Sequence, residues 1–144
     1  MFENLFMLVK SNAGEAVIQN PVIPAGQSEA VINDASSAII EVLKKQLDNG
    51  RIKDLIRFFK FMDVKNNELV TSMINRFANK LNKYYNIDPK SAFNASSLLI
   101  VPVIEQMAKL SKSTAESEFT INRFLSKLSG GNDFSTLVDS YMAA

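Results

Sequence analysis

Two groups of basic residues are the part of this 144-residue sequence most able to do chemistry. Within each group the residues recur at a spacing of three or four, which places side chains on one side of a helix. The six residues are Lys53, Arg57, Lys60, Arg76, Lys80 and Lys83. They predict a basic face on helices over about residues 51–85, where cations could contact phosphates or the carboxylates of a protein partner.

The charge distribution supports a distinct basic block. Residues 49–90 contain nine basic and four acidic residues, a net charge of +5, whereas residues 1–48 have −3 and residues 91–144 have −1. Three interpretations remain open for this block: ordinary solvent-exposed helix faces, a surface for an acidic protein, or a nucleic-acid surface of the helix-turn-helix type. The pI of about 7.9 lies below the ~9 typical of nucleic-acid-binding domains, which ranks nucleic acid last.

Residues suited to catalysis or metal binding are scarce. The chain has no histidine, the commonest general base at neutral pH, and no cysteine, the strongest nucleophile among side chains. No phosphate-binding glycine loop or nucleophile-elbow motif occurs. Gly130 and Gly131, followed by Asn132 and Asp133, could form an anion or metal loop, but a helix end followed by a helix start explains them more simply. We therefore predict no catalytic residue, no metal site and no cofactor, and a protein that is not an enzyme.

Several features of the whole chain point to a protein of the cytoplasm. The first residues lack the positive segment of a secretory signal. The longest apolar run has seven residues, far short of the ~20 that a membrane span needs. The absence of cysteine fits a reducing compartment. At this length we expect one domain, residues 1–144.

Hydrophobic spacing predicts an all-α fold. Apolar residues recur with helical periodicity, and no segment alternates in the way a strand does. Asp88 and Pro89 form a helix-start signal, and Phe119 with Phe124 predicts a hydrophobic staple around another start. We expect six to seven helices, at about 2–19, 28–48, 52–62, 68–85, 89–109, 120–128 and 133–142, with a polar linker at 111–117.

The helix at about 89–109 is expected at the centre of the domain. Residues 98–104 are apolar on every side and include Pro102, so this segment should be surrounded. We expect Leu98, Ile100, Val101 and Ile104 all to be buried. Three surroundings remain open: the core of a monomer, a helix shared by a homodimer, or a lipid or other apolar ligand.

The sequence also resembles a known family. The matching segments are residues 17–24, 29–32 and 35–36, then Asp88-Pro89, the apolar helix with Pro102, and residues 119–131. Together they resemble a YidB-like family of bacterial helical proteins over roughly residues 2–140. The resemblance implies an all-helical fold and transfers no catalytic residues, because the family has no assigned function. The family tends to be glycine-rich in its middle, where this chain has charged and asparagine-rich helices.

These observations favour a non-enzymatic helical interaction module that could associate with itself or with another protein. The alternative is a nucleic-acid-binding protein that uses the basic helices.

Overall fold

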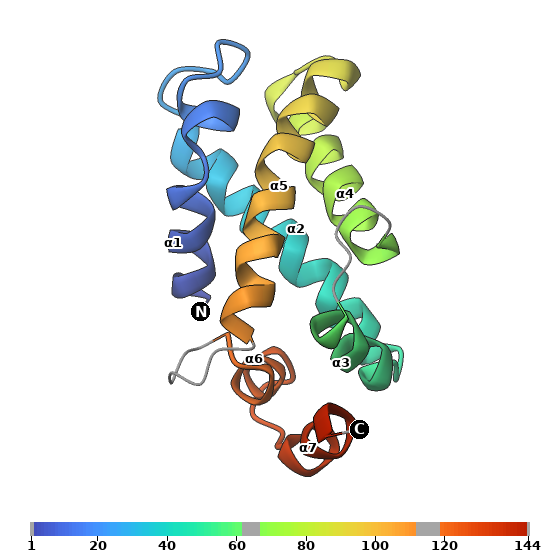
Figure 1. Ribbon diagram of the computed structural model, residues 1–144. Coiled ribbons are helices and arrows are strands. Elements are labelled where there is room, and N and C mark those ends of the chain that lie inside the picture. The colour runs from blue at the N-terminus through green and yellow to red at the C-terminus, as the bar shows by residue number, and fades with distance from the viewer. Residues whose placement is uncertain (1, 62–66, 112–118, 144) are drawn as a thin grey trace.

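Every secondary-structure element that the structure describes is a helix (Figure 1). The computed structural model describes residues 2–61, 67–111 and 119–143, and 78% of these residues are helical, with no strand among them. The elements are α1 (Glu3–Ser11), η1 (Gly14–Ile18), α2 (Ser28–Asp48), α3 (Ile52–Lys60), α4 (Glu68–Tyr85), α5 (Pro89–Ser111), α6 (Ile121–Leu128) and α7 (Ser135–Ala143). The all-α prediction is confirmed.

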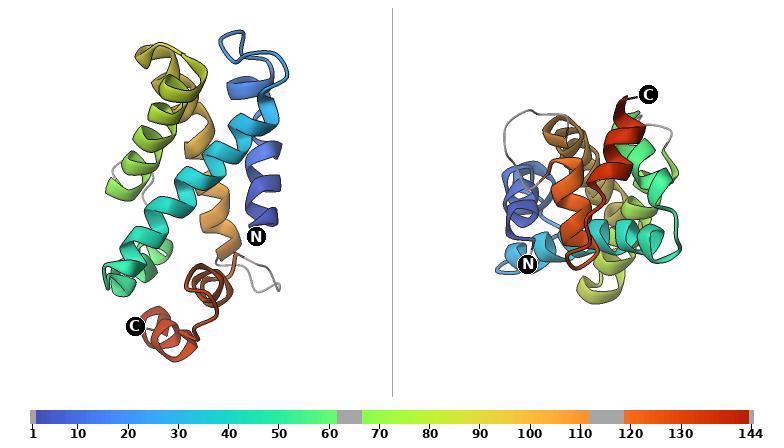
Figure 2. Two further views of the ribbon diagram at one scale, coloured as in Figure 1. Left: turned by 180° about the vertical axis from the view of Figure 1, so that it is seen from behind. Right: turned by 90° about the horizontal axis from the view of Figure 1, so that it is seen from below.

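Helices α1, α2, α4 and α5 form the body of the molecule. In Figure 1, α5 lies between α1 and α4, and α2 crosses behind them from upper left to lower right. Figure 2 shows the same crossing from the back and, from below, α6 and α7 closing the end of the bundle together with α3. Buried apolar side chains from all eight elements form one cluster, and Val138 is the buried residue that α7 contributes.

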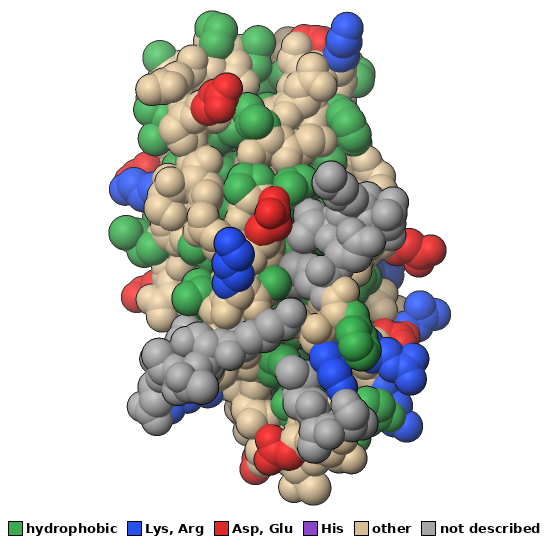
Figure 3. Space-filling view, viewed as in Figure 1, with side chains coloured by type: hydrophobic (Ala, Val, Ile, Leu, Met, Phe, Trp, Pro, Cys, Tyr) green, Lys and Arg blue, Asp and Glu red, His purple; other side chains and the backbone are tan. Residues whose placement is uncertain are grey.

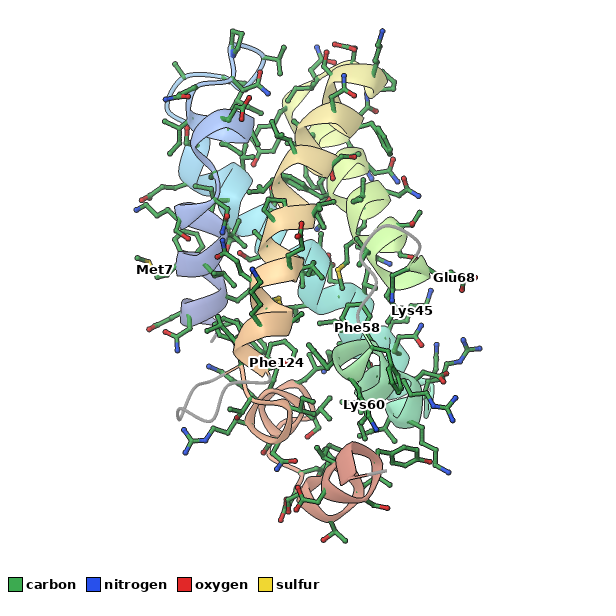
Figure 4. All side chains as sticks on the ribbon, viewed as in Figure 1. Met7, Lys45, Phe58, Lys60, Glu68 and Phe124 are labelled. Atoms are coloured by element: carbon green, nitrogen blue, oxygen red, sulfur yellow. The ribbon has the colours of Figure 1, made fainter. Side chains whose placement is uncertain are left out.

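Aromatic side chains connect the lower helices to the body. Phe124 of α6 contacts three other rings, with centroid distances of 5.9 Å to Phe2, 5.7 Å to Phe59 and 6.3 Å to Phe119. The last of these contacts is the predicted staple. Figure 4 shows Phe124 just below the end of α5, where these rings meet.

Side-chain caps explain why α4 and α5 begin where they do. The Oδ1 atom of Asn67 accepts from the backbone N–H of Leu69 at 2.8 Å and of Val70 at 3.3 Å. The Oδ2 atom of Asp88 accepts from the backbone N–H of Ser91 at 3.0 Å, and this bond lowers the pKa of Asp88. The predicted cap at Asp88 is therefore confirmed.

The expected first helix, residues 2–19, is wrong in its continuity. The α-helix ends at Ser11, and the segment 14–18 is a separate π-helical turn. The side chain of Asn12 donates to the carbonyl oxygen of Leu8 at 2.8 Å and so competes with the helical bonding pattern. Beyond it, Ile18 N–H bonds to the Ala13 carbonyl oxygen, five residues back.

The expectation that residues 98–104 are buried on all sides is also wrong. Ile100 and Ile104 are fully buried, but Val101 is only half-buried and Leu98 is 47% exposed. The reason is the arrangement of Figure 1, in which neighbours cover the flanks and the back of α5 and leave its front open. The helix is central in the fold yet partly exposed.

Two further points concern the rest of the chain. No helix in the described ranges is long and apolar enough to cross a membrane. Apart from Ser111, which ends α5, the predicted linker 111–117 lies outside the described residues. The connection between α3 and α4 at 62–66 also lies outside them.

Candidate functional site

An apolar stripe runs along the open side of α5. We define the stripe as Phe93, Leu98, Val101 and Pro102. Phe93 is 48% exposed, Leu98 nearly as much, and the other two are half-buried. No charged residue occurs between positions 91 and 104. In Figure 3 hydrophobic and uncharged polar surface covers the upper part of α5, and charged side chains are sparse there.

The two flanks of the stripe are set by the neighbouring helices. On one flank, Phe93 lines a shallow pocket with Asn75, Asn79 and other residues of α4. On the other flank, Gln106 exchanges two hydrogen bonds of 3.2 Å with Asn12, which follows α1. The stripe is thus a ridge with polar borders, and such bordered apolar surface is typical of interaction sites.

Pro102 adds a polar group to this ridge. Proline has no backbone N–H, so the carbonyl oxygen of Leu98 cannot receive the helical hydrogen bond from residue 102. Ser96 does not replace that donor, because its hydroxyl donates across to the Ile74 carbonyl oxygen of α4 at 2.6 Å. The Leu98 carbonyl oxygen therefore lacks its usual helical donor.

Opposite charges lie at the two ends of the stripe. Lys90 is exposed in the first turn of α5, and Glu105 is exposed one turn beyond Pro102. They are 15 residues apart, about 22 Å along a helix axis. Sequence reasoning named neither residue, although a helical projection of 90–105 places both on the side of Leu98.

The six predicted basic residues lie in three different surroundings. Lys53 and Lys60 of α3 face α7, since the Lys53 ammonium lies 5.9 Å from the centre of the Tyr141 ring and Lys60 donates to the Tyr141 carbonyl oxygen at 2.8 Å. Figure 4 shows Lys60 between α3 and α7. Arg57 instead lines a pocket of about 500 Å³ next to Phe58 and Phe61.

The remaining three basic residues are brought together on α4. Arg76, Lys80 and Lys83 line a groove of about 520 Å³, bordered on the α2 side by Glu41. Lys80 Nζ lies 3.1 Å from Glu41 Oε1. The basic surface with a shared geometry is therefore this groove, and the other three cations lie elsewhere.

Tyr85 and Asp34 form the strongest polar contact between α2 and α4. The hydroxyl of Tyr85 donates to Asp34 Oδ2 at 2.5 Å. Burial, then this hydrogen bond, then the charge of Asp34 raise the pKa of Tyr85 far above its ordinary value. The pair fixes the two helices that border the groove, and nothing in its position suggests proton transfer to a ligand.

The glycine pair after α6 proves to be a helix end. Gly130 and Gly131 both have positive φ angles, 82° and 114°, and their N–H groups bond to carbonyl oxygens of the last turn of α6. Asp133 Oδ1 accepts from Ser135 N–H at 2.9 Å, which lowers the pKa of Asp133 and starts α7. Across the described residues no cluster of acids could hold a metal ion.

Comparisons with protein-family models, curated proteins and solved structures find no match for this chain. Its membership of the YidB-like family stays a prediction, and so do its compartment and the absence of enzymatic activity.

Proposed function

We propose that this protein is a non-enzymatic helical interaction module that associates with a second copy of itself through the stripe on α5. The observation that carries the proposal is an exposed apolar ridge with a cation at one end and an anion at the other. Such a ridge is complementary to a second copy that packs antiparallel to it, because the cation of each copy then lies opposite the anion of the other. A twofold interface of this kind uses the same surface patch on both subunits.

The residue numbers fix a definite register for this pairing. If two α5 helices pack antiparallel with Lys90 opposite Glu105, the centre of the contact falls between Ser97 and Leu98. The centre of the apolar stripe, at Leu98 and Val101, then faces its own copy. The opposed pairs on the shared face are Lys90 with Glu105, Asn94 with Val101, and Ser97 with Leu98. Phe93 and Pro102 lie at the two edges of this face, because nine residues turn a helix by about half a revolution.

The energy expected from this contact is modest. The four stripe residues are already partly buried in the single chain, so only their exposed portions add apolar burial, at roughly 25 cal/mol per Å². Each end-to-end ion pair occurs twice and contributes about 0.2–1 kcal/mol. We therefore expect a weak dimer, with a dissociation constant between ~1 μM and ~1 mM.

A charge exchange tests the register. Lys90→Glu alone, or Glu105→Lys alone, places like charges opposite one another at both ends and should weaken the dimer by about tenfold. The double variant restores opposite charges and should return the dissociation constant close to that of the wild type. Sedimentation velocity over a concentration series measures all four proteins.

Two further variants complete the test. Leu98→Glu places a charge at the centre of the contact and should leave the protein monomeric at every concentration. Lys45→Glu is a matched control, because Lys45 lies on α2 at the edge of the molecule, away from α5 (Figure 4). A monomeric wild type, or a dimer that Leu98→Glu leaves intact, contradicts the proposal. A dimer in which the double variant fails to recover contradicts the antiparallel register.

The nucleic-acid alternative has less support. It needs the cations of α3 and α4 to act together, and the contacts of Lys53 and Lys60 with α7 separate them from the groove on α4.

A further inference from the structure

The groove on α4 is a second surface, which adjoins the stripe on α5 at Asn75 and Asn79. Its cations lie along one side of α4, and Glu41 of α2 forms its border. The lining residues are Glu41, Ser72, Asn75, Arg76, Asn79, Lys80, Lys83 and Tyr84. Asn75 and Asn79 also line the pocket beside Phe93, whereas Arg76, Lys80 and Lys83 line only the groove. A dimer formed through α5 therefore leaves these three cations accessible.

One cation in this groove already holds a carboxylate from a neighbouring helix. Lys80 is only 18% exposed, and its partner Glu41 projects from α2. The Lys80–Glu41 ion pair shows that a carboxylate on a neighbouring helix can bind a cation of this groove. Glu41 neutralises the middle cation, Lys80, and the two outer cations are Arg76 and Lys83.

Those outer two cations, Arg76 and Lys83, lack an ion-pair partner among the described residues. They are seven residues apart, about 10.5 Å along the helix, and lie on the same side of it. Between them Asn79 is exposed and its side-chain amide makes no hydrogen bond within the described part of the chain. The surface offers two positive charges at a fixed separation, with a hydrogen-bonding group between them.

We propose that this groove binds an acidic helix of a partner protein, with two carboxylates seven residues apart facing Arg76 and Lys83. A helix that lies along α4 has the same rise per residue, so carboxylates seven positions apart repeat the ~10.5 Å spacing. Tyr84, 60% exposed at the end of the groove, gives the partner an aromatic surface to pack on. Aromatic and arginine side chains are enriched where partners bind most strongly.

The number of cations favours a protein over a nucleic acid. With Lys80 paired to Glu41, two cations remain for a ligand. Neutralising two phosphates gives a slope of log affinity on log salt of only about −2, whereas proteins that bind nucleic acid through phosphates commonly contact 6–10 of them. A helix with two carboxylates needs no more than the groove supplies.

The test uses a fluorescein-labelled peptide, stapled to be helical, with two glutamates seven residues apart and no other charge. The matched control peptide has its glutamates five residues apart, which turns them to different sides of the helix. Fluorescence anisotropy measures binding of both peptides, and of a single-stranded oligothymidine, to the full chain. We expect the first peptide to bind at least ~10-fold more tightly than the control peptide and than the oligonucleotide, because both cations engage only the first peptide.

Variants of the protein assign the binding to the groove. Arg76→Gln and Lys83→Gln should each weaken binding of the first peptide by about threefold, and together by about tenfold. Glu41→Gln removes the internal carboxylate and frees Lys80, so it should strengthen binding by about threefold. Lys109→Gln, at an exposed position near the end of α5, is the control and should change nothing. Circular dichroism confirms that each variant keeps its helices.

Three results would overturn the inference: no preference between the two peptides, an affinity that the groove variants do not change, or tighter binding of the oligonucleotide. The last result would place a nucleic acid in the groove. None of them bears on dimerisation, which Leu98→Glu tests separately.

Discussion

Leu98 and Leu99 are neighbours in sequence with opposite surroundings, and truncating each of them tests the description of α5. Leu99 is 0% exposed and Leu98 is 47% exposed. A helix turns by about 100° per residue, which carries one side chain into the core and the other to the open side. We expect Leu99→Ala to destabilise the protein strongly and Leu98→Ala only slightly.

The structure sets the size of the difference. Truncating a fully buried leucine costs about 2.7–5.0 kcal/mol, because both the transfer energy and the packing around the cavity are lost. Leu98→Ala removes the same three carbon atoms, and each contributes about 0.8 kcal/mol when it is fully buried. Because Leu98 is about half exposed, only about half of this energy is lost, and the expected cost is ~1 kcal/mol. The two variants should differ by at least ~2 kcal/mol, or roughly 4–8 °C in melting temperature.

Urea unfolding followed by far-ultraviolet circular dichroism measures both free energies of unfolding. The experiment is run at low protein concentration, so that association through α5 does not add to the stability of the wild type. Equal losses for the two variants would refute the reasoning. Equal losses would mean that Leu98 is buried, as the apolar segment 98–104 predicts from sequence, and that α5 has no exposed side.

Three other substitutions test individual contacts. Tyr85→Phe should cost about 1–2 kcal/mol at neutral pH by removing the bond to Asp34. Because the folded state raises the pKa of Tyr85 above the ordinary 10.0, this contribution is complete below pH 10 and is lost as the pH rises further. The stability difference between variant and wild type should therefore shrink in urea titrations above pH 10. Asn67→Ala should cost ~1 kcal/mol by removing the cap of α4, whereas Asn67→Asp should not. Ser96→Ala should cost about 0.5–1.5 kcal/mol through the lost bond to Ile74, and Ser97→Ala, its half-buried neighbour, should cost less in the same thermal unfolding assay.

Much of the fold follows from local signals in the sequence. The segments 28–48 and 68–85 were predicted with the bounds they have, because each is amphipathic and its ends are marked, as at Asn49-Gly50. The start of α5 follows from Asp88 and Pro89 in the same way. The break after Ser11 could not be predicted from periodicity, since apolar residues keep their helical spacing through a π-helical turn. At the break, the side chains of Ser11 and Asn12 both donate to the Leu8 carbonyl oxygen and compete with the helical bonding pattern.

The candidate sites depend on information that a single sequence lacks. Residues 98–104 are apolar all round, so the pattern cannot say which side of the helix neighbours cover. The basic residues have the same difficulty: Lys53 and Lys83 look alike in sequence, yet one contacts the aromatic ring of α7 and the other faces an open groove. In both cases the packing of distant helices decides the role of a side chain.

The attachment of α7 has a consequence for the charge that α3 presents. Among the side chains of α7 that the structure describes, only Val138 is buried, and the hydrogen bond from Lys60 ends on a backbone carbonyl oxygen. A terminal helix with so few buried contacts belongs to the low-stability end of a protein, and its amide hydrogens exchange through local opening without unfolding of the core. Each opening breaks the contact of Lys53 with Tyr141. The electrostatic potential over α3 is therefore an average over closed and open states, and anything that lengthens, cleaves or binds the last nine helical residues changes it.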